Sequence, residues 1–323
     1  MRNHTIDVRQ ASGKVLFSTV FCSDGTKLLR KGHLLKDEDV RQLQTAGLSE
    51  VSVAELESGD MGEAQAVTAV AMGMARGALQ IQLAPGGRAN VFTTEPSCIL
   101  VDEQRLQQLN CTSSIVVATA RNFSYAPLGR RVATVKSAPF AVPKTDLQNL
   151  QSILQESGTL LEALPLRAPS TAVLYTDSEN GAKARRLFEH LLEQRLSAIG
   201  VNASFALTCS EDEAAIAKSL RCLLMVKPTL ILIASTTSPA GPSDAVGRAM
   251  QDIECHIEKF LAPVEPGNLL LLGYHNRVPI LSAPGCFRSS KTNVLDLMLP
   301  PLLAEYRVSG WEIAALGHGG LLG

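Results

Sequence analysis

From Thr171 onward, short apolar runs alternate with longer segments of helical periodicity. The runs "TAVLYT", "PTLILIAS", "NLLLLG" and "VPILSAP" are almost wholly apolar, which is typical of strands buried on both faces. Between the runs, "AKARRLFEHLLEQRLSAIG" and "SEDEAAIAKSLRCLLMV" have the spacing of amphipathic helices. This alternation predicts an α/β fold in which residues 171–323 form a doubly wound, mainly parallel sheet.

The preceding residues have shorter patterns, which predict smaller α+β parts. Residues 1–79 are expected to form an N-terminal α+β segment, with a hairpin turn at Asp24-Gly25 and a helix capped by Asp37. Residues 80–143 contain four strand-like pieces and a short helix beginning at Asp102. They predict a small β-rich α/β unit packed with the first segment. Residues 144–170 predict one helix and a proline-containing linker.

Capping residues predict where two helices of the C-terminal sheet begin. Ser210 with Glu213 three residues later has the form of a capping box. After the last apolar strand, Ser289 or Ser290 is expected to cap the following helix.

Composition and charge limit the classes of function. The chain has 323 residues, of which 46% are hydrophobic and 19% charged, and its net charge is -1. Such a balance argues against nucleic acid as the main partner, and no apolar run has the length of a membrane span. The polar start "MRNHTIDVRQ" has no signal-peptide core, so a cytoplasmic protein is expected. Seven scattered cysteines without a C-x-x-C pair argue against a disulfide framework or zinc site.

In a doubly wound sheet, ligands bind beyond the carboxyl ends of the strands. The first loop there contains Thr176 and Asp177, which are expected either to bind a polar ligand or simply to form and cap the turn. A second loop ends at Asp244, a candidate helix cap, phosphate-metal ligand or catalytic base. Four consecutive hydroxyl-bearing residues begin it: Ser235, Thr236, Thr237 and Ser238.

The third loop, "APGCFRSSKTN", carries the strongest anion-binding signal. Pro284 and Gly285 predict a tight turn, and Arg288 and Lys291 add positive charge near the start of a helix. The stretch also approaches the P-loop pattern, but Ser290 stands where that pattern has glycine, which argues against nucleotide hydrolysis. Cys286 is expected to favour its thiolate beside these charges, or else to be merely a small buried residue.

Taken together, these motifs resemble the molybdopterin-binding proteins related to the molybdenum-cofactor biosynthesis (MoCF) domain. The resemblance rests on the hydroxyl-rich loop with Asp244, "EPGNLLLLG", "VPILSAPGC-x-R-S-x-K-x-N" and "GHGGLL", and it extends to "LRKGHLLKDEDVRQLQTAGLSEVSVAELESGDMGEAQA" and "RVATVKSAPFAVP". It implies a molybdopterin or molybdenum-cofactor ligand. Carried over by position, the implied ligand residues are Ser235, Thr236, Thr237, Ser238, Asp244, Pro284, Gly285, Cys286, Arg288, Ser289, Ser290 and Lys291.

The chain departs from the pattern of molybdenum-inserting relatives at two loops. Thr237-Ser238-Pro239 stands where they have a twin glycine, and Pro284-Gly285-Cys286-Phe287 stands where they have proline-glycine-asparagine-proline. The resemblance therefore favours ligand binding over metal insertion.

Three functions stay open on the sequence. The first is binding of molybdopterin or the cofactor during its biosynthesis, handling or delivery to a molybdoenzyme or maturation partner. The second is an adenylyl- or molybdenum-transferase in which Asp244 positions Mg²⁺ or molybdate. The third is an interaction protein that kept the fold and lost the ligand. Relatives of this domain commonly self-associate, so a homo-oligomer is also an expectation.

Overall fold

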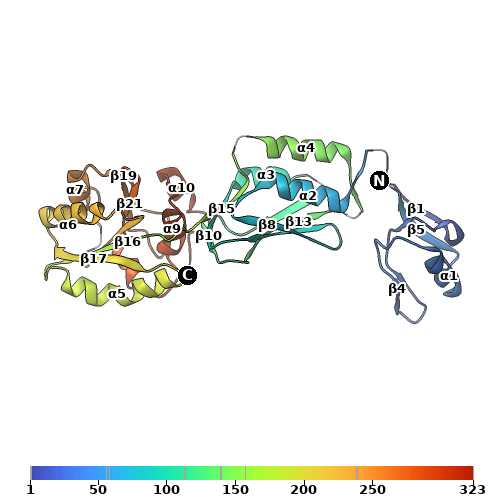
Figure 1. Ribbon diagram of the computed structural model, residues 1–323, viewed down its shortest axis with the longest axis horizontal. Coiled ribbons are helices and arrows are strands. Elements are labelled where there is room, and N and C mark those ends of the chain that lie inside the picture. The colour runs from blue at the N-terminus through green and yellow to red at the C-terminus, as the bar shows by residue number, and fades with distance from the viewer. Residues whose placement is uncertain are drawn as a thin grey trace. The chain divides into compact units, whose positions relative to one another are not determined.

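The computed structural model describes residues 2–55, 57, 59–112, 114–138, 140–156, 158–237 and 239–322 (Figure 1). The chain divides into two compact units. The first comprises Met1–Phe92, Val101–Ala120 and Arg130–Glu162, and the second comprises Thr93–Leu100, Arg121–Gly129 and Ala163–Gly323. None of the helices in these described ranges has the length and apolar character needed to cross a bilayer.

The N-terminal part of the first unit is a small sheet with one helix and its own core of residues such as Leu16, Leu43 and Val53. The predicted turn at Asp24-Gly25 is confirmed, since Asp24 accepts the N–H of Thr26 at 2.8 Å. Asp37 was expected as a helix cap but is the first helical residue, and Lys36 is the N-cap. The elements are β1 (Arg2–Asp7), η1 (Val8–Gln10), β2 (Val15–Leu16), β3 (Val20–Phe21), β4 (Lys27–Leu29), α1 (Asp37–Thr45) and β5 (Glu50–Glu55).

The remainder of the first unit contains the four predicted strands in one antiparallel sheet, in the order β11-β13-β9-β8. Asp102 caps its short helix, as predicted, by accepting the N–H of Arg105. The elements are β6 (Met61–Gly62), α2 (Glu63–Met74), β7 (Ala75–Gly77), β8 (Leu79–Ala84), β9 (Arg88–Thr93), α3 (Glu103–Asn110), β11 (Ile115–Thr119), β13 (Arg131–Ser137), β14 (Ala141–Val142) and α4 (Lys144–Gln155).

Two segments of the region 80–143 group with the second unit instead of the first. They contain most of β10 (Ser97–Val101) and all of β12 (Ser124–Ala126), which pair antiparallel. Cys98 and Phe123 from these segments are buried in the core of the second unit. These strands are too short to show a clear periodicity in the sequence. In addition, β15 (Leu161–Pro165) replaces part of the expected linker.

The second unit is built on a six-stranded sheet in the order β17-β16-β18-β21-β20-β19. Strands β16, β17, β18 and β21 are mutually parallel, and β20 runs antiparallel to both of its neighbours. The prediction of a doubly wound, mainly parallel sheet is therefore confirmed. The strands are β16 (Thr171–Asp177), β17 (Ala203–Ser210), β18 (Leu230–Ser235), β19 (His256–Phe260), β20 (Leu271–His275) and β21 (Val278–Ser282).

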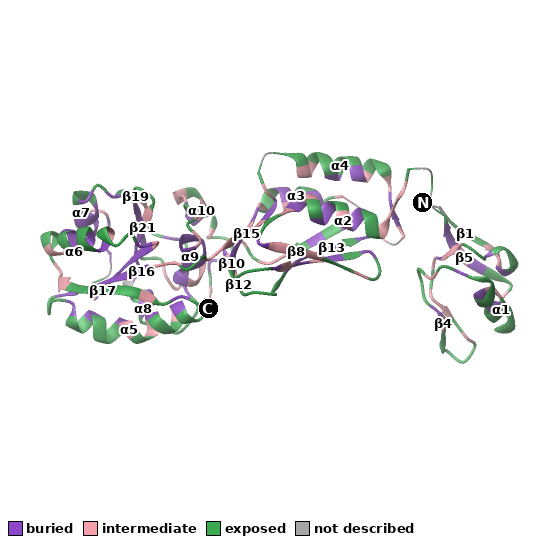
Figure 2. Ribbon diagram, viewed as in Figure 1, coloured by how far each residue is buried: buried purple, intermediate pink, exposed green. Residues whose placement is uncertain are grey.

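Helices cover both faces of this sheet. On one face, Phe188 of α5 and Leu295 of α9 pack with Leu232. On the other face, Leu220 of α6 and Met250 of α7 pack with Ile233. Figure 2 shows β16 buried between these helices, and every residue of β16 and β18 is buried. The helices are α5 (Ala182–Ser197), α6 (Glu213–Met225), α7 (Ala245–Asp252), α8 (Pro284–Phe287), α9 (Val294–Leu303) and α10 (Gly310–Ala315).

The predicted caps of α6 and α9 are wrong. Asp212 caps α6 by accepting the N–H of Ala215, and Ser210 donates its hydroxyl to Asp212. Asn293 caps α9 in a capping box with Asp296, so the helix begins after the serines at 289 and 290. In each case a polar residue two to four positions further along the chain is the cap, because helix starts depend on local geometry.

Backbone hydrogen bonds join the glycine-rich tail to the "EPGN" loop. Glu265 donates its N–H to Gly320 at 2.7 Å and accepts the N–H of Leu322 at 2.8 Å. A Cβ at Gly320 would lie 2.3 Å from the carbonyl oxygen of Pro263. Gly320 is therefore needed for close packing.

Gly181, at the amino end of α5, provides a test of how tightly the β16–α5 turn is packed. Its φ is +82°, and a Cβ there would lie 2.3 Å from the carbonyl oxygen of Tyr175. We expect Gly181→Ala to lower the free energy of unfolding by about 2 kcal/mol or more, because backbone strain and a steric clash add. Urea or thermal unfolding followed by circular dichroism measures the loss.

Gly200→Ala is the matched control, since Gly200 also has a positive φ, of +74°, but meets only an ordinary contact at 3.9 Å. It should cost about 1 kcal/mol through the left-handed backbone alone. Equal losses for the two variants would contradict the close approach at Gly181.

Candidate functional site

The three loops selected from the sequence begin at one edge of the six-stranded sheet. Thr176 pairs with Ser235 across β16 and β18, and Ile233 pairs with Ser282 across β18 and β21. Because these strands are parallel, their carboxyl ends lie at the same edge. The backbone N–H of Thr236 also donates to the carbonyl oxygen of Thr176 at 3.2 Å, which ties the first two loops together.

The connections diverge at this edge. After β16 the chain enters α5 on one face, whereas after β18 it enters α7 on the opposite face. After β21 it returns to the face of α5, where α8 and α9 lie. Such a topological switch point opens a crevice between neighbouring strand ends, which is where open α/β sheets bind ligands.

Asp177 organises the first loop. Its carboxylate is fully buried and accepts the backbone N–H groups of Glu179, Gly181 and Ala184 at 2.5, 3.1 and 2.5 Å. Burial raises the pKa of this carboxyl, but the backbone hydrogen bonds outweigh burial and bring the pKa below its ordinary value. Of the two readings left open for this residue, the geometry favours the one in which it forms and caps the turn.

Thr176 differs from its neighbour. Its side chain is completely buried, and among the described residues no oxygen or nitrogen partners its hydroxyl. It lies across from Cys209 of β17, whose thiol is only a weak hydrogen-bonding group.

The hydroxyl groups of the second loop are gathered by Glu211, which the sequence reasoning did not select. Ser235 donates to one carboxylate oxygen of Glu211, and Thr237 donates to the other at 3.0 Å. Glu211 follows the carboxyl end of β17, so the rule used for the other loops would have found it. Thr236 is half-buried, and Ser238 lies outside the described residues.

Asp244 is the N-cap of α7. One carboxylate oxygen accepts the N–H of Gly247 and the other accepts the N–H of Ala240, both at 2.7 Å. Of the roles considered for this residue, helix capping is confirmed.

The third loop departs from a P-loop. Pro284 and Gly285 were expected to form a tight turn but lie in the short helix α8, and α9 begins only after Asn293. The Asn293 amide donates to the carbonyl oxygens of Cys286 and Lys291 at 3.2 and 3.1 Å. A Cβ at Gly285 would meet nothing within 4 Å, so the backbone there is open to approach.

Arg195 of α5 clamps the same loop. It donates to the carbonyl oxygens of Ser289 and Lys291 at 2.6 and 3.2 Å, and it forms an ion pair with Asp296. The side chain of Arg195 is only 10% exposed, so this contact is shielded from solvent. Beside it lies a cavity of about 380 Å³, whose lining includes Tyr125, Gln194, Arg195, Ser289, Ser290 and Asp296.

Two cationic side chains of the third loop remain available. Arg288 is exposed, and its guanidinium lies 5.7 Å from the ring centroid of Phe188. Lys291 is exposed as well. Neither cation has an ion-pair partner in the described part of the chain, whereas Arg195 is fully engaged. Both cations can therefore receive an anion without breaking an existing ion pair.

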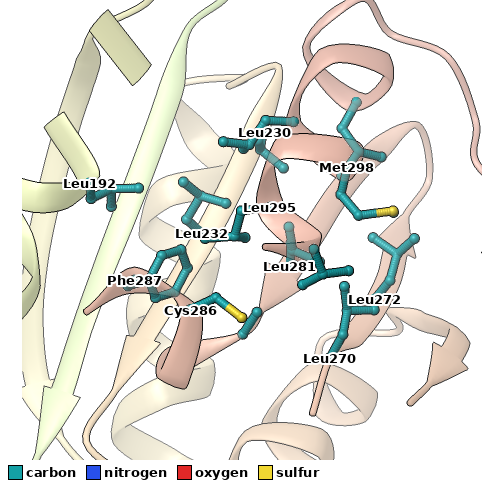
Figure 3. Close-up of a cluster of buried hydrophobic side chains, with 14 of the residues drawn as sticks. Leu192, Leu230, Leu232, Leu270, Leu272, Leu281, Cys286, Phe287, Leu295 and Met298 are labelled. Atoms are coloured by element: carbon teal, nitrogen blue, oxygen red, sulfur yellow. The ribbon is translucent and has the colours of Figure 1, made fainter. Parts of the chain in front are cut away.

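Cys286 does not have the reactive thiolate considered from the sequence. Figure 3 shows it among Leu281, Phe287 and Leu295, and it is 6% exposed. Burial raises the pKa of its thiol to about 11, because the nearby Arg195 lowers the pKa by less than burial raises it. The reading of Cys286 as a small buried residue is confirmed.

Comparison with known proteins gives distant likenesses. The family model of a domain of unknown function (DUF8806) matches residues 5–55. No curated protein matches the chain at a significant level. A molybdopterin biosynthesis MoeA protein from Pyrococcus horikoshii is 10% identical with a TM-score of 0.33, and the alignment covers 94% of this chain and 75% of that chain.

Two further solved structures are similar at the same distance. A molybdenum cofactor biosynthesis protein from Pyrococcus furiosus is 11% identical with a TM-score of 0.26, over 94% of this chain and 64% of that chain. A molybdopterin biosynthesis protein from Mycobacterium abscessus is 10% identical with a TM-score of 0.31, over 47% of this chain and 98% of that chain. At these values the likenesses assign the chain to no family and no activity.

The buried Asp177 predicts how stability depends on pH. Because the pKa of Asp177 is lowered in the folded state, its contribution is fully present above about 3.9, the ordinary pKa, and is lost as pH falls through the folded value. We expect Asp177→Asn to lower the free energy of unfolding by about 2 kcal/mol at pH 7. The gap from wild type should begin to close as the pH falls below about 4.

Urea unfolding between pH 7 and pH 3 measures that gap. Asp252→Asn is the control, because Asp252 is 51% exposed in an ion pair with Arg221. An Asp177→Asn gap that stays constant across this range would contradict the role of the carboxylate.

The raised pKa of Cys286 predicts that its thiol resists alkylation. At neutral pH we expect Cys286 to react with iodoacetamide at least about tenfold more slowly than Cys222, which is exposed. Peptide mapping by mass spectrometry after timed labelling measures both rates in one sample. Equal rates would show that the Cys286 thiol is not shielded from iodoacetamide and that its pKa is not raised.

Proposed function

We propose that the second unit binds a phosphate-bearing pterin of the molybdopterin type in the crevice at the carboxyl ends of β16, β18 and β21. The observation that carries this proposal is the strand register, which brings the three polar loops to one edge. The sequence resemblance to molybdopterin-binding proteins supplies the ligand class. Such a ligand needs an anion site at one end and many hydrogen bonds at the other.

The third loop suits the phosphate. Arg288 and Lys291 are exposed cations without ion-pair partners in the described ranges, and the backbone around Gly285 is open. A phosphate at the second loop would instead meet the Glu211 carboxylate. Like charges at short range repel, more strongly where water is excluded. From Gly285 the third loop runs along α5, with Arg288 on Phe188 and Lys291 beside Arg195. The anion is therefore assigned to the side of Arg288 and Lys291, away from Glu211.

The second loop suits the pterin ring. A pterin presents N–H donors along one edge, and a carboxylate is an acceptor that can receive two of them. Glu211 lies there with the hydroxyl groups of Ser235 and Thr237, which rotate to donate or accept. The buried hydroxyl of Thr176, which lies beside the Cys209 thiol, adds one more polar group next to Ser235.

The geometry favours binding over transfer chemistry. Both carboxylate oxygens of Asp244 already accept backbone N–H groups, which leaves this residue as a loop support. Among the described residues, no three or more His, Cys, Asp or Glu side chains are grouped to hold a metal ion. We therefore assign the protein a role in handling or delivering the pterin, with the transferase as the second candidate.

Removing one cation tests the anion site. Lys291→Ala should weaken binding of molybdopterin about tenfold, because one phosphate contact in a half-open site contributes on the order of 1.4 kcal/mol. Binding should also weaken with added salt for the wild type and less so for the variant. Quenching of pterin fluorescence under anaerobic conditions measures the dissociation constants.

Lys218→Ala is the matched control, since Lys218 is exposed on α6 on the other face of the sheet. It should bind like the wild type. No binding by the wild type, or equal weakening by both variants, would overturn the proposal. Binding accompanied by Mg²⁺-dependent turnover that Asp244→Asn abolishes would favour the transferase instead.

A further inference from the structure

Strand β17 forms one end of the six-stranded sheet and pairs on one side only, with β16. Residues 204–208 are all exposed, so both faces of the strand as well as its outer edge meet solvent. Phe205 and Leu207 are 42% and 37% exposed. Figure 2 shows most of β17 in the exposed colour, in contrast to the buried β16 beside it.

The flanking helices do not cover the middle of the strand. Ala203 packs against the core on the α5 face, and Cys209 packs against the core on the α6 face. Both residues lie near the ends of β17. Between them, a run of unpaired backbone N–H and C=O groups is open along the outer edge.

The opposite edge of the same sheet is protected. Strand β19 carries Glu258 and Lys259, and Glu258 accepts the N–H of Gly310 at the start of α10 at 2.8 Å. Charged residues and a covering helix are common protections of sheet edges. The segment "ASFALTCS" of β17 has no charge, proline or glycine. One edge is therefore closed and the other is open to pairing.

We propose that β17 pairs antiparallel with β17 of a second copy of this chain, so that two six-stranded sheets continue into one across a twofold axis. The second copy is the occupant because the strand carries no charged side chain, so two copies of it can approach without repulsion. An antiparallel pair also keeps the acidic Glu211 and Asp212 of the two copies at opposite ends. A parallel pair would place these carboxylates side by side, where they repel.

Symmetry restricts the register. A twofold axis perpendicular to the sheet leaves each side chain on its own face. Two residues that lie directly opposite each other therefore have numbers that are both even or both odd. With Ala206 on the axis, Phe205 of each copy lies opposite Leu207 of the other. These side chains share the face of α6, because Phe205 pairs with Ala172 and Leu207 with Leu174 within one chain. The small Ala206 at the axis leaves room for both apolar pairs.

Sedimentation velocity of the full chain over a range of concentrations tests the pairing. The wild type should form a species of twice the 34.5 kDa chain mass, and Leu207→Lys should lose it. Met225→Lys is the matched control, because Met225 is an 81% exposed apolar residue on α6, and it should dimerise like the wild type. Unchanged thermal unfolding confirms that Leu207→Lys is folded.

Two double variants test the register. Phe205→Lys with Leu207→Glu should restore the dimer, because opposite charges then face each other across the twofold axis. Phe205→Lys with Leu207→Lys should remain monomeric. A monomeric wild type, or a dimer that survives Leu207→Lys, overturns the proposal, and equal behaviour of the two double variants overturns the register. Pterin binding is measured separately, so its failure leaves this result unaffected.

Discussion

The pairing of two completely buried parallel strands, β16 and β18, is the constraint on which the second unit depends. A strand without an exposed face must be covered on both sides, so helices are required on each face of the sheet. Parallel direction then places every strand-to-helix connection at one edge. The clustering of polar loops at that edge is thus a consequence of burial and direction.

Most polar groups at the edge stabilise the loops themselves. Backbone N–H groups at a tight turn need acceptors when buried, and Asp177 and Asp244 supply them. Asn293 and Arg195 satisfy the carbonyl oxygens of the third loop in the same way. What remains for a ligand is smaller than the list of polar residues suggests. It comprises the cations Arg288 and Lys291, the buried hydroxyl of Thr176 and the carboxylate of Glu211 with its hydroxyl partners.

The presence or absence of hydrogen-bond partners also distinguishes the two edges of the sheet. Backbone groups at an edge strand have partners on one side only, and they are protected, left to water or paired with another chain. At β19, charge and α10 protect them, whereas at β17 the exposed apolar residues favour pairing over hydration. The ligand crevice and the open edge are both formed by β16 and its neighbours but use different groups, so occupation of one does not require the other.

The sequence by itself determined the strands and helices of the six-stranded sheet and the edge where its polar loops begin. Apolar strands such as "TAVLYT" and helical periodicity are local signals, and parallel alternation follows from them. It did not determine the caps of α1, α6 and α9, where neighbouring polar residues compete locally. It also did not determine β10 and β12 or the use of each polar side chain, because these depend on distant partners. Only the tertiary structure brought Glu211 to Ser235, buried Cys286, and left Lys291 free of an ion pair in the described chain. Side chains of the same type at one sheet edge acquired different roles because burial and hydrogen-bond geometry, rather than residue type, decide which groups are already satisfied.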